Sequence, residues 1–205
     1  MKKFFITILA LVPLTLWAQD NTWERPEIEE EETKEVSVNP NQKYLRGAVP
    51  MVDGRVVFSK TIEAPGKSAA QIYNILQKYM QKMAKEKNQI NSQVALADSV
   101  KHMLAGRYEE WLVFKSVALW TDKTRLYYVL EVNCHDGRAD INMCRIHYLY
   151  DEYRKPQRLT AEEWITDKEA VNKKNTKLLP ISGKFRRKTI DRKDFLFNKL
   201  ETLLK

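Results

Sequence analysis

Hydrophobic and polar residues alternate along this chain in a pattern that predicts a mixed α+β fold. Residues 55–62 alternate with a period of two, which indicates a half-buried strand, and an Ala-Pro-Gly break follows it. Ser68 and Gln71 then have the spacing of a capping box. The apolar residues after this cap recur at helical spacing and are Ile72, Ile75, Leu76, Tyr79, Met80 and Met83. We therefore expect an amphipathic helix of about 18 residues with its apolar stripe in the core.

From Asn91 onward the pattern becomes that of antiparallel strands. We expect a short strand around residues 94–98, a longer one over residues 108–120, and two more over residues 125–134 and 138–151. The polar run Thr-Asp-Lys-Thr between the second and third of these strands predicts a turn, and His-Asp-Gly before the last strand predicts a hairpin. The fold class is thus α+β, a curved antiparallel sheet with one main helix on a face and further helices at the C-terminal end.

The register of the last hairpin has two alternatives. A two-residue turn over the Asp-Gly pair would set Arg145 and His147 opposite the apolar face of residues 125–134. A three-residue loop with a left-handed glycine would instead bring Cys144 and Ile146 opposite that face. We prefer the three-residue loop because it buries fewer charges.

The residue pattern of the C-terminal part predicts two further helices packed on the domain. Thr160 and Glu163 form a second capping box for a helix that runs to about Val171. Trp164 is expected to anchor this helix against the sheet rather than to stay exposed as a binding residue, because large aromatic side chains usually bury area. A connecting turn over residues 178–183 leads to a closing helix, whose cap would be Thr189 or Asp191 and whose apolar stripe is Leu196, Phe197, Leu200, Leu203 and Leu204.

The first residues have the pattern of a secretory signal peptide. Lys2 and Lys3 precede an almost wholly apolar run over residues 4–17, and Ala18 before Gln19 is a small residue where signal peptidase could cut. The alternative is a membrane anchor, but this run is short for the roughly 20 residues that span a bilayer. Without a cysteine at the cut there is no lipid attachment. We therefore expect a periplasmic or secreted protein without a transmembrane anchor after cleavage.

Charge divides the rest of the chain into three parts. Residues 19–54 form an acidic leader with several prolines, which we expect to be flexible, although Tyr44 to Met51 could instead lie on the domain as an extra edge segment. Residues 55–152 hold the strands and the main helix. Residues 153–205 form a basic C-terminal extension, and its last 33 residues contain eleven basic and three acidic side chains.

The two cysteines invite a disulfide in an exported protein, but the hairpin does not favour one. In the preferred register Cys144 lies opposite Tyr128, which is six residues or roughly 20 Å along the strand from Cys134. The two-residue turn places the two thiols on opposite faces, and only a slipped register centred on Ala139 would let them meet. We predict that Cys134 and Cys144 are unpaired and largely buried.

No pattern for catalysis or for a metal stands out. The three histidines are His102, His135 and His147, and none has a second ligand at a useful spacing. The neighbouring carboxylates Glu109-Glu110, Asp151-Glu152 and Glu162-Glu163 are typical of solvated surfaces. Phosphate-binding glycine loops, the nucleophile elbow and the Ser-x-x-Lys pattern are missing from the sequence. We expect no cofactor, no metal and no catalytic residue.

A dense basic cluster before the last helix is the one candidate binding feature. It consists of Lys184, Arg186, Arg187 and Lys188. Long-range attraction could bring these residues to an anionic surface such as a phosphorylated glycolipid. The alternative, which we favour, is a solvated face that keeps the protein soluble or pairs with the acidic leader.

The order of these elements resembles a bacterial family of exported proteins known as a domain of unknown function with a fold like that of TATA-binding protein (TBP-like). The resemblance covers residues 55–150. Its strongest matches are the segment Val57 to Ile62 with Pro65 to Ser68 after it, and Asp136-Gly137-Arg138 before the last strand. Residues 161–167 also resemble a segment that follows this domain in relatives. Ala139 and Asp140 stand where relatives tend to carry a second basic residue.

The resemblance implies a fold and leaves the chemistry open. We expect a non-enzymatic module of the bacterial envelope whose sheet face or basic tail binds an envelope protein, a glycan or an anionic lipid surface. The alternative is an uncharacterised periplasmic hydrolase, which would need groups from several elements to converge in a pocket. Nucleic acid is not expected as a partner, because export removes the chain from cytosolic DNA and because a fold does not carry a function.

Overall fold

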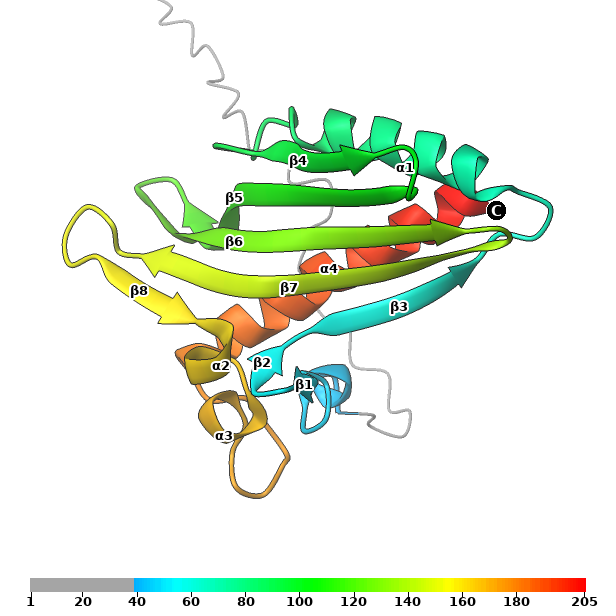
Figure 1. The fold of residues 1–205 in the computed structure, drawn as a ribbon. Helices are drawn as coiled ribbons and strands as arrows, with labels where there is room; N and C mark the ends of the chain where they lie inside the picture. Colours follow the sequence, from blue (N-terminus) through cyan, green and yellow to red (C-terminus); the bar gives the residue numbers. More distant parts are fainter. Residues whose placement is uncertain (1–38) are drawn as a thin grey trace, which may run out of the picture.

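A computed structural model of the chain describes residues 39–205 (Figure 1). The helices in this part are the 3-10 helix η1 (Gln42–Tyr44) and the α-helices α1 (Ala69–Met83), α2 (Ala161–Trp164), α3 (Asp167–Ala170) and α4 (Ser182–Leu204). The strands are β1 (Met51–Val52), β2 (Arg55–Val56), β3 (Phe58–Glu63), β4 (Gln93–Asp98), β5 (Met103–Val117), β6 (Trp120–His135), β7 (Arg138–Tyr150) and β8 (Gln157–Thr160).

Six strands form one antiparallel sheet in the order β3-β7-β6-β5-β4. β8 also pairs with β7, on residues His147 to Tyr150, whereas β3 pairs with residues Arg138 to Met143. β3 and β8 therefore share one edge of β7, and β6 lies on its other edge. β1 and β2 form a separate two-stranded ribbon.

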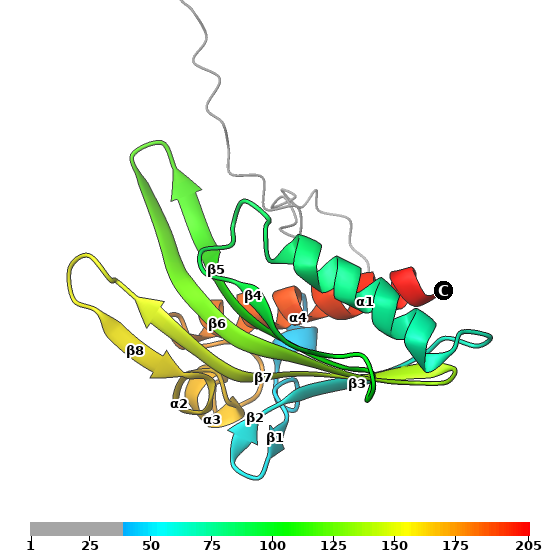
Figure 2. The ribbon, with the colours of Figure 1, turned by 45° about the horizontal axis from the view of Figure 1, so that its top comes forward.

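The core lies between the sheet and two helices on the same side of it. The even-numbered side chains of β6 from Thr124 to Cys134 are all buried and face this side. α1 contributes Ile72, Leu76 and Met80 to the same cluster, and α4 contributes a longer stripe that includes Leu196 and Leu200. Figures 1 and 2 show both helices crossing one face of the curved sheet and leaving the other face uncovered by any helix of the described part. The α+β class with a curved antiparallel sheet is thereby confirmed.

Two elements are found where the sequence predicts them, the first helix and the strand segment before it. Ser68 accepts a hydrogen bond from the backbone of Gln71, and Gln71 accepts one from the backbone of Ser68, so the predicted capping box is formed. The helix that follows is α1. The alternating segment over residues 55–62 is confirmed as β2 and β3, in which Val56, Phe58 and Ile62 are buried.

The predicted turn over Thr121 to Thr124 is wrong, because these residues belong to β6. The turn consists of Ala118 and Leu119, and Val117 pairs directly with Trp120. β7 reaches only as far as Thr124 along β6, so the end of the β5–β6 hairpin lacks a third strand beside it. A hairpin end exposed on both sides tolerates polar residues, which removes the apolar alternation that marks a strand elsewhere.

The preferred three-residue loop of the β6–β7 hairpin is also wrong. His135 pairs with Arg138 around a two-residue turn, and the register then shifts by one residue between Tyr127 and Val129. Arg145 lies at this bulge with a left-handed φ of 54°. The bulge changes which residues of β7 face the core, from Met143 before it to Ile146 after it. The expected burial of charge by a two-residue turn therefore does not occur.

The C-terminal helices differ from the prediction in their limits. Thr160 does cap α2, accepting from the backbone of Glu163, but the helix ends at Trp164, and α3 starts after Thr166, whose backbone is extended. α4 begins at Ser182, much earlier than expected.

Two predicted contacts of these helices are also changed. Thr189 and Asp191, expected as caps of the last helix, lie inside α4. Trp164 is half-buried and meets the edge of Phe185 of α4, with ring centroids 5.9 Å apart, so its ring contact is with a helix.

The acidic leader is packed on the domain over its described part. Tyr44, Leu45 and Val49 are buried, which corresponds to the alternative that this segment lies on the domain. Residues 19–38, and the predicted signal peptide with its cut between Ala18 and Gln19, lie outside the described residues. Among residues 39–205, no helix has the length and apolar character needed to cross a membrane.

Candidate binding surface

The side of the sheet opposite α1 and α4 is uncovered, and we call it the open face. Side chains alternate along each strand, so the odd-numbered residues of β6 point to this side. Residues paired across antiparallel strands share a face, and Tyr127 is paired with Glu109 of β5 and with His147 of β7. The open face is therefore defined by Arg107, Glu109, Trp111, Arg125, Tyr127, Val129, Glu131, His147 and Leu149.

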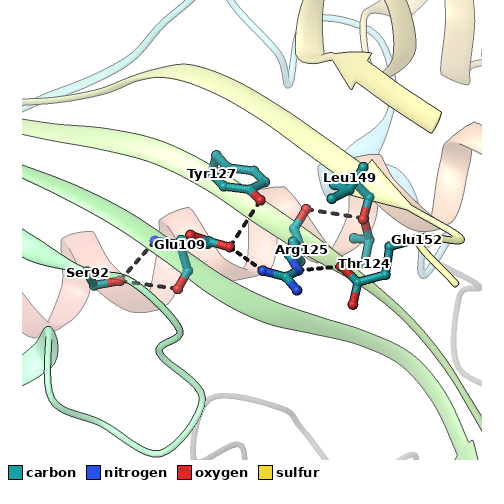
Figure 3. A network of polar contacts seen from close by, with 7 residues as sticks. All are labelled: Ser92, Glu109, Thr124, Arg125, Tyr127, Leu149 and Glu152. Atoms are coloured by element: carbon teal, nitrogen blue, oxygen red, sulfur yellow. Dashed lines mark hydrogen bonds and ion pairs between the residues drawn. The ribbon is translucent and has the colours of Figure 1, made fainter. Parts of the chain in front are cut away.

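A polar network lies at the centre of the open face (Figure 3). Arg125 donates to Glu109 at 2.7 Å and to Glu152 at 2.5 Å, so one guanidinium joins two carboxylates. Tyr127 donates its hydroxyl to the same Glu109 oxygen at 3.0 Å, and the backbone of Glu109 donates to Ser92 at 2.9 Å. The network links β5, β6 and the segment after β7, which fixes the side chains on one surface.

The contact between Arg125 and Glu152 stabilises the ionised form of both groups. Hydrogen bonds from Glu152 and Glu109 raise the pKa of Arg125. Burial opposes ionisation of Glu152, but the hydrogen bonds from Arg125 and Tyr153 outweigh it and lower the pKa of that carboxyl. Burial and the hydrogen bond to Glu109 raise the pKa of Tyr127. Arg125 and Glu152 are therefore charged and Tyr127 is neutral at neutral pH.

Aromatic rings form the second part of this surface. Tyr127 and His147 stack with centroids 4.5 Å apart and planes 3° from parallel. Lys123 lies 3.6 Å from the centroid of the Trp111 ring, and Arg125 lies 5.2 Å from it. The bulge at Arg145 makes the stacking possible, because without it the odd-numbered His147 would face the core as Met143 does.

A pocket of about 550 Å³ continues this surface toward the C-terminal end of β7. It lies between the β5–β6 hairpin and the loop after β7. Its walls include Trp111, Trp120, Lys123, Leu149, Glu152 and Tyr153. With Tyr150, four aromatic residues line the pocket together with charged groups. Such a lining suits a small ligand or a partner side chain that has both polar and apolar parts.

The basic cluster predicted from the sequence is not one surface. Arg186 is fully buried and donates to the backbone oxygens of Tyr44, Leu45 and Ile165 and to the carboxylate of Asp167. Burial lowers the pKa of Arg186 despite its contact with Asp167. This residue holds the N-terminal segment on α4 and is not available to a partner.

The other three cations of the cluster lie around the same helix. Lys184 donates to Asp122 at 2.6 Å and to the hydroxyl of Tyr150. Arg187 is exposed and donates to Asn41, and Lys188 is half-buried and also has an interaction partner. Because α4 turns by about 100° per residue, these side chains point in different directions. The structure therefore does not bring Lys184, Arg186, Arg187 and Lys188 together as a binding patch.

The cysteines lie on opposite faces of the hairpin. Cys134 is buried on the core side, Cys144 is half-buried opposite Val129, and both thiols are free. Burial raises the pKa of Cys134 to about 12 and that of Cys144 to about 11. Thiols with such values are almost wholly protonated at neutral pH and react slowly as nucleophiles.

The histidines are separated from one another. His102 contacts the ring of Tyr73, His135 lies 3.3 Å from Asp140, and His147 belongs to the open face. Within residues 39–205, no group of three His, Cys, Asp or Glu side chains is arranged to hold a metal ion.

The interpretation of Glu109 and Glu110 as solvated carboxylates is wrong. Glu110 is fully buried and receives two hydrogen bonds of 2.6 Å from Arg192, which is also fully buried. Asn88 and Gln89 donate to the same carboxylate. The signal was present in the sequence, because Glu110 continues the inward alternation of Tyr108 and Leu112.

The fold and the comparisons together define the class of protein. Residues 58–149 match the family described as a domain of unknown function (DUF4468) with TBP-like fold. A TBP-like protein from Parabacteroides distasonis ATCC 8503 superposes with a TM-score of 0.60 over 76% of this chain and 96% of its own, at 22% identity, which is a likeness of fold alone. The protein is thus an α+β protein with a TBP-like fold, and the predicted resemblance is confirmed.

A second solved structure places the chain in a particular family. A DUF4468 family protein from Bacteroides ovatus ATCC 8483 is 43% identical, with a TM-score of 0.74 over 80% of this chain and 94% of that one. The chain belongs to the DUF4468 family. A comparison with curated proteins finds no match.

Proposed function

We propose that this protein is an exported, non-enzymatic module of the bacterial envelope that binds a partner protein on its open face. The observation that carries the proposal is a sheet with two unlike sides. One side is closed by α1 and α4, whereas the other carries a fixed layer of aromatic and charged side chains with no described element over it. Aromatic side chains and arginine are enriched where proteins bind one another.

The charges of the open face favour a protein over a nucleic acid. Arg125 is shared between Glu109 and Glu152, and Glu131 lies two positions from Val129 on the same side. A surface for nucleic acid would need unpaired cations in excess to displace the counterions of the phosphates. Alternating signs instead suit a partner with complementary groups of both signs.

The ionisation of the candidate groups supports binding rather than hydrolysis. General acids and bases work with pKa values near the operating pH. The carboxyl of Glu152 has a lowered pKa, and the pKa values of both thiols are raised by burial. None of these groups is set for proton transfer or nucleophilic attack at neutral pH.

The binding proposal can be tested by photo-crosslinking in intact cells. A photoreactive phenylalanine analogue replaces Tyr127 on the open face, and in a matched protein it replaces Gln81, an exposed residue of α1 on the other side of the molecule. We expect one or a few defined protein adducts from position 127 and none from position 81. The same adducts from both positions, or none from position 127, would overturn the proposal.

Export is tested separately by fractionation and intact mass. We expect the protein in the periplasmic or secreted fraction with Gln19 as its first residue, which would confirm cleavage after Ala18. A full-length chain in the cytosol would contradict export without deciding whether the open face binds a partner.

A further inference from the structure

The β5–β6 hairpin extends past the rest of the sheet and ends in apolar residues. β4 reaches only to Arg107 along β5, and β7 reaches only to Thr124 along β6. Residues 115–123 therefore pair only with each other, and no third strand lies beside them. Figure 2 shows this end of the hairpin projecting from the body. We call residues 115–123 the hairpin tip.

The hairpin tip exposes apolar side chains that the fold does not need there. Leu119 is 95% exposed at the turn, Trp120 is 53% exposed and Val117 is 41% exposed. A single exposed apolar residue is ordinary, but three within four positions at the most distant point of a hairpin form a patch. Moving each of these side chains out of water would lower the free energy.

A second loop carries the same kinds of residues to the same end of the molecule. The loop between β7 and β8 contains Tyr153, which is 82% exposed, followed by Arg154 and Lys155. Trp120 and Tyr153 both line the pocket described above, which places the loop next to the hairpin tip.

The balance of charge at this end is positive. Lys115, Lys123, Arg154 and Lys155 have no ion-pair partner within residues 39–205, and all of them are exposed or half-buried. The nearby carboxylates Asp122 and Glu152 are instead paired with Lys184 and Arg125. Asp151 of the same loop adds one negative charge against these four cations. Lys115 and Lys123 flank the apolar turn on the two strands of the hairpin.

We propose that the hairpin tip and the Tyr153 loop dock this protein on an anionic phospholipid membrane. Leu119 would enter the outer part of the acyl layer, because it is the most exposed apolar residue at the apex. Trp120 and Tyr153 would lie at the level of the head groups, where amphipathic rings are favoured. Lys115, Lys123, Arg154 and Lys155 would meet the lipid phosphates.

The proposed contact adjoins the open face at Lys123 and the pocket, but it leaves out the centre of that face. The network of Arg125, Tyr127 and His147 lies on the body of the sheet and would stay accessible on a docked molecule. Failure of membrane binding would leave the crosslinks expected from position 127 unchanged, so the two proposals can fail independently.

Vesicle binding by the mature chain, which begins at Gln19, provides the test. Flotation compares vesicles of phosphatidylglycerol mixed with phosphatidylcholine against vesicles of phosphatidylcholine alone. We expect binding to the anionic vesicles, and we expect the double variant Leu119→Ser, Trp120→Ser to lose it by about tenfold or more. Replacing Arg154 and Lys155 by glutamate should weaken binding to the anionic vesicles in the same direction.

The matched control is Val100→Ser. Val100 is 88% exposed in the loop between β4 and β5, which lies at the other end of β5 from the hairpin tip. This variant should bind like the unchanged protein, since it removes a comparable exposed apolar group far from the proposed contact. Equal losses in the control and in the double variant would overturn the assignment.

A second experiment measures how deeply Trp120 enters the bilayer. Lipids with bromine atoms on their acyl chains quench tryptophan fluorescence only at close range. We expect quenching in the unchanged protein and its loss in Trp120→Phe, which keeps an aromatic ring at the tip. Trp23, Trp111 and Trp164 are present in both proteins, so the difference between them reports on Trp120. Equal quenching in the two proteins, or no vesicle binding by the unchanged protein, would show that the hairpin tip does not enter a membrane.

Discussion

Glu110 of β5 and Arg192 of α4 form an ion pair in the interior of the protein. Both side chains are fully buried, so each charge has lost its hydration and depends on the other. Asn88 and Gln89 satisfy further lone pairs of the carboxylate. The pair joins β5 to α4 and fixes how the helix lies across the sheet.

Replacing one member of this pair should be strongly destabilising. We expect Arg192→Met to lower the free energy of unfolding by about 3–5 kcal/mol, because it leaves the carboxylate of Glu110 buried without its cation. The double variant Glu110→Gln, Arg192→Met should recover much of this loss, since the amide oxygen can still accept from Asn88 and Gln89. Urea unfolding measures both. A cost below about 1 kcal/mol for Arg192→Met, the range of exposed pairs, would contradict this account.

A second residue gives a dependence of stability on pH. Hydrogen bonds from Lys60 and Lys205 lower the pKa of Glu201 from 4.5 to about 2. A carboxyl with a lowered pKa in the folded state stabilises the fold above its unfolded value, and the contribution is lost as the pH falls from about 4.5 to about 2. Glu201→Gln should therefore have a lower melting temperature than the unchanged protein at pH 7, and the difference should vanish near pH 2.

Glu63→Gln provides the control for this experiment. Glu63 is an exposed residue of β3 with no ion pair in the described part of the chain. Its replacement should leave the pH dependence of the melting temperature nearly unchanged. The same pH-dependent difference in both variants would show that general charge, and not the Lys60 contact, is responsible.

Among the elements, β7 has the feature that the sequence pattern could not predict. Its buried residues change from odd to even numbers at Arg145, and one constant alternation cannot describe both halves. The position of the bulge depends on how both halves of β7 pair with β6 and pack on the helices. A local sequence pattern does not contain this information. The cap of α1 was predictable because Ser68 and Gln71 satisfy each other within one turn.

The start of α4 was missed for a related reason. Its first turns contain four cations, which suggest a solvated loop. In the structure Phe185, Arg186 and Thr189 nevertheless face the core and its neighbours, with the charge of Arg186 satisfied by backbone oxygens. A buried arginine is recognisable only when its acceptors are known, and these come from distant parts of the chain. The sheet face was expected as a binding surface, but the contact of His147 with Tyr127 on it was not, because these two residues are paired only in the bulged register.

The backbone at the bulge should discriminate between substituents. Arg145 has a φ of 54°, where a branched side chain is strained and glycine is not. We expect Arg145→Val to lower the melting temperature by an amount that corresponds to about 1 kcal/mol or more, and Arg145→Gly to be neutral or stabilising. Arg107→Val, on the open face of β5, should be tolerated because valine favours extended strands. Equal losses for the two valine variants would argue against the bulge as the cause.

For the molecule as a whole, Arg186 connects parts that are far apart in the sequence. It donates to the backbone oxygens of Tyr44 and Leu45 on one side. On the other side it donates to the backbone oxygen of Ile165 and to the carboxylate of Asp167. The N-terminal segment over residues 39–50 is thereby held on α4, together with weaker contacts such as that between Lys43 and Asp191.

Loss of Arg186 should free this segment before the sheet is affected. We expect Arg186→Met to increase the rate of tryptic cleavage at Lys43 and Arg46 by tenfold or more. The reason is that losing several hydrogen bonds to a charged group lowers the free energy needed to detach the segment. Arg187→Met is the matched variant, because Arg187 makes one exposed contact with Asn41, and its effect should be small. Equal protection of the segment in both variants would show that Arg186 does not hold it.

The position of the N-terminal segment on α4 also determines how the protein can be immobilised or labelled. The C-terminal end of α4 and the first described residues both lie on the helical side of the sheet, away from Tyr127 and His147. A surface-attachment tag or a fluorescent reporter joined at Lys205 would therefore extend from the back of the molecule. Such a fusion would orient every copy with its aromatic and charged surface toward the solution, where a soluble partner could reach it.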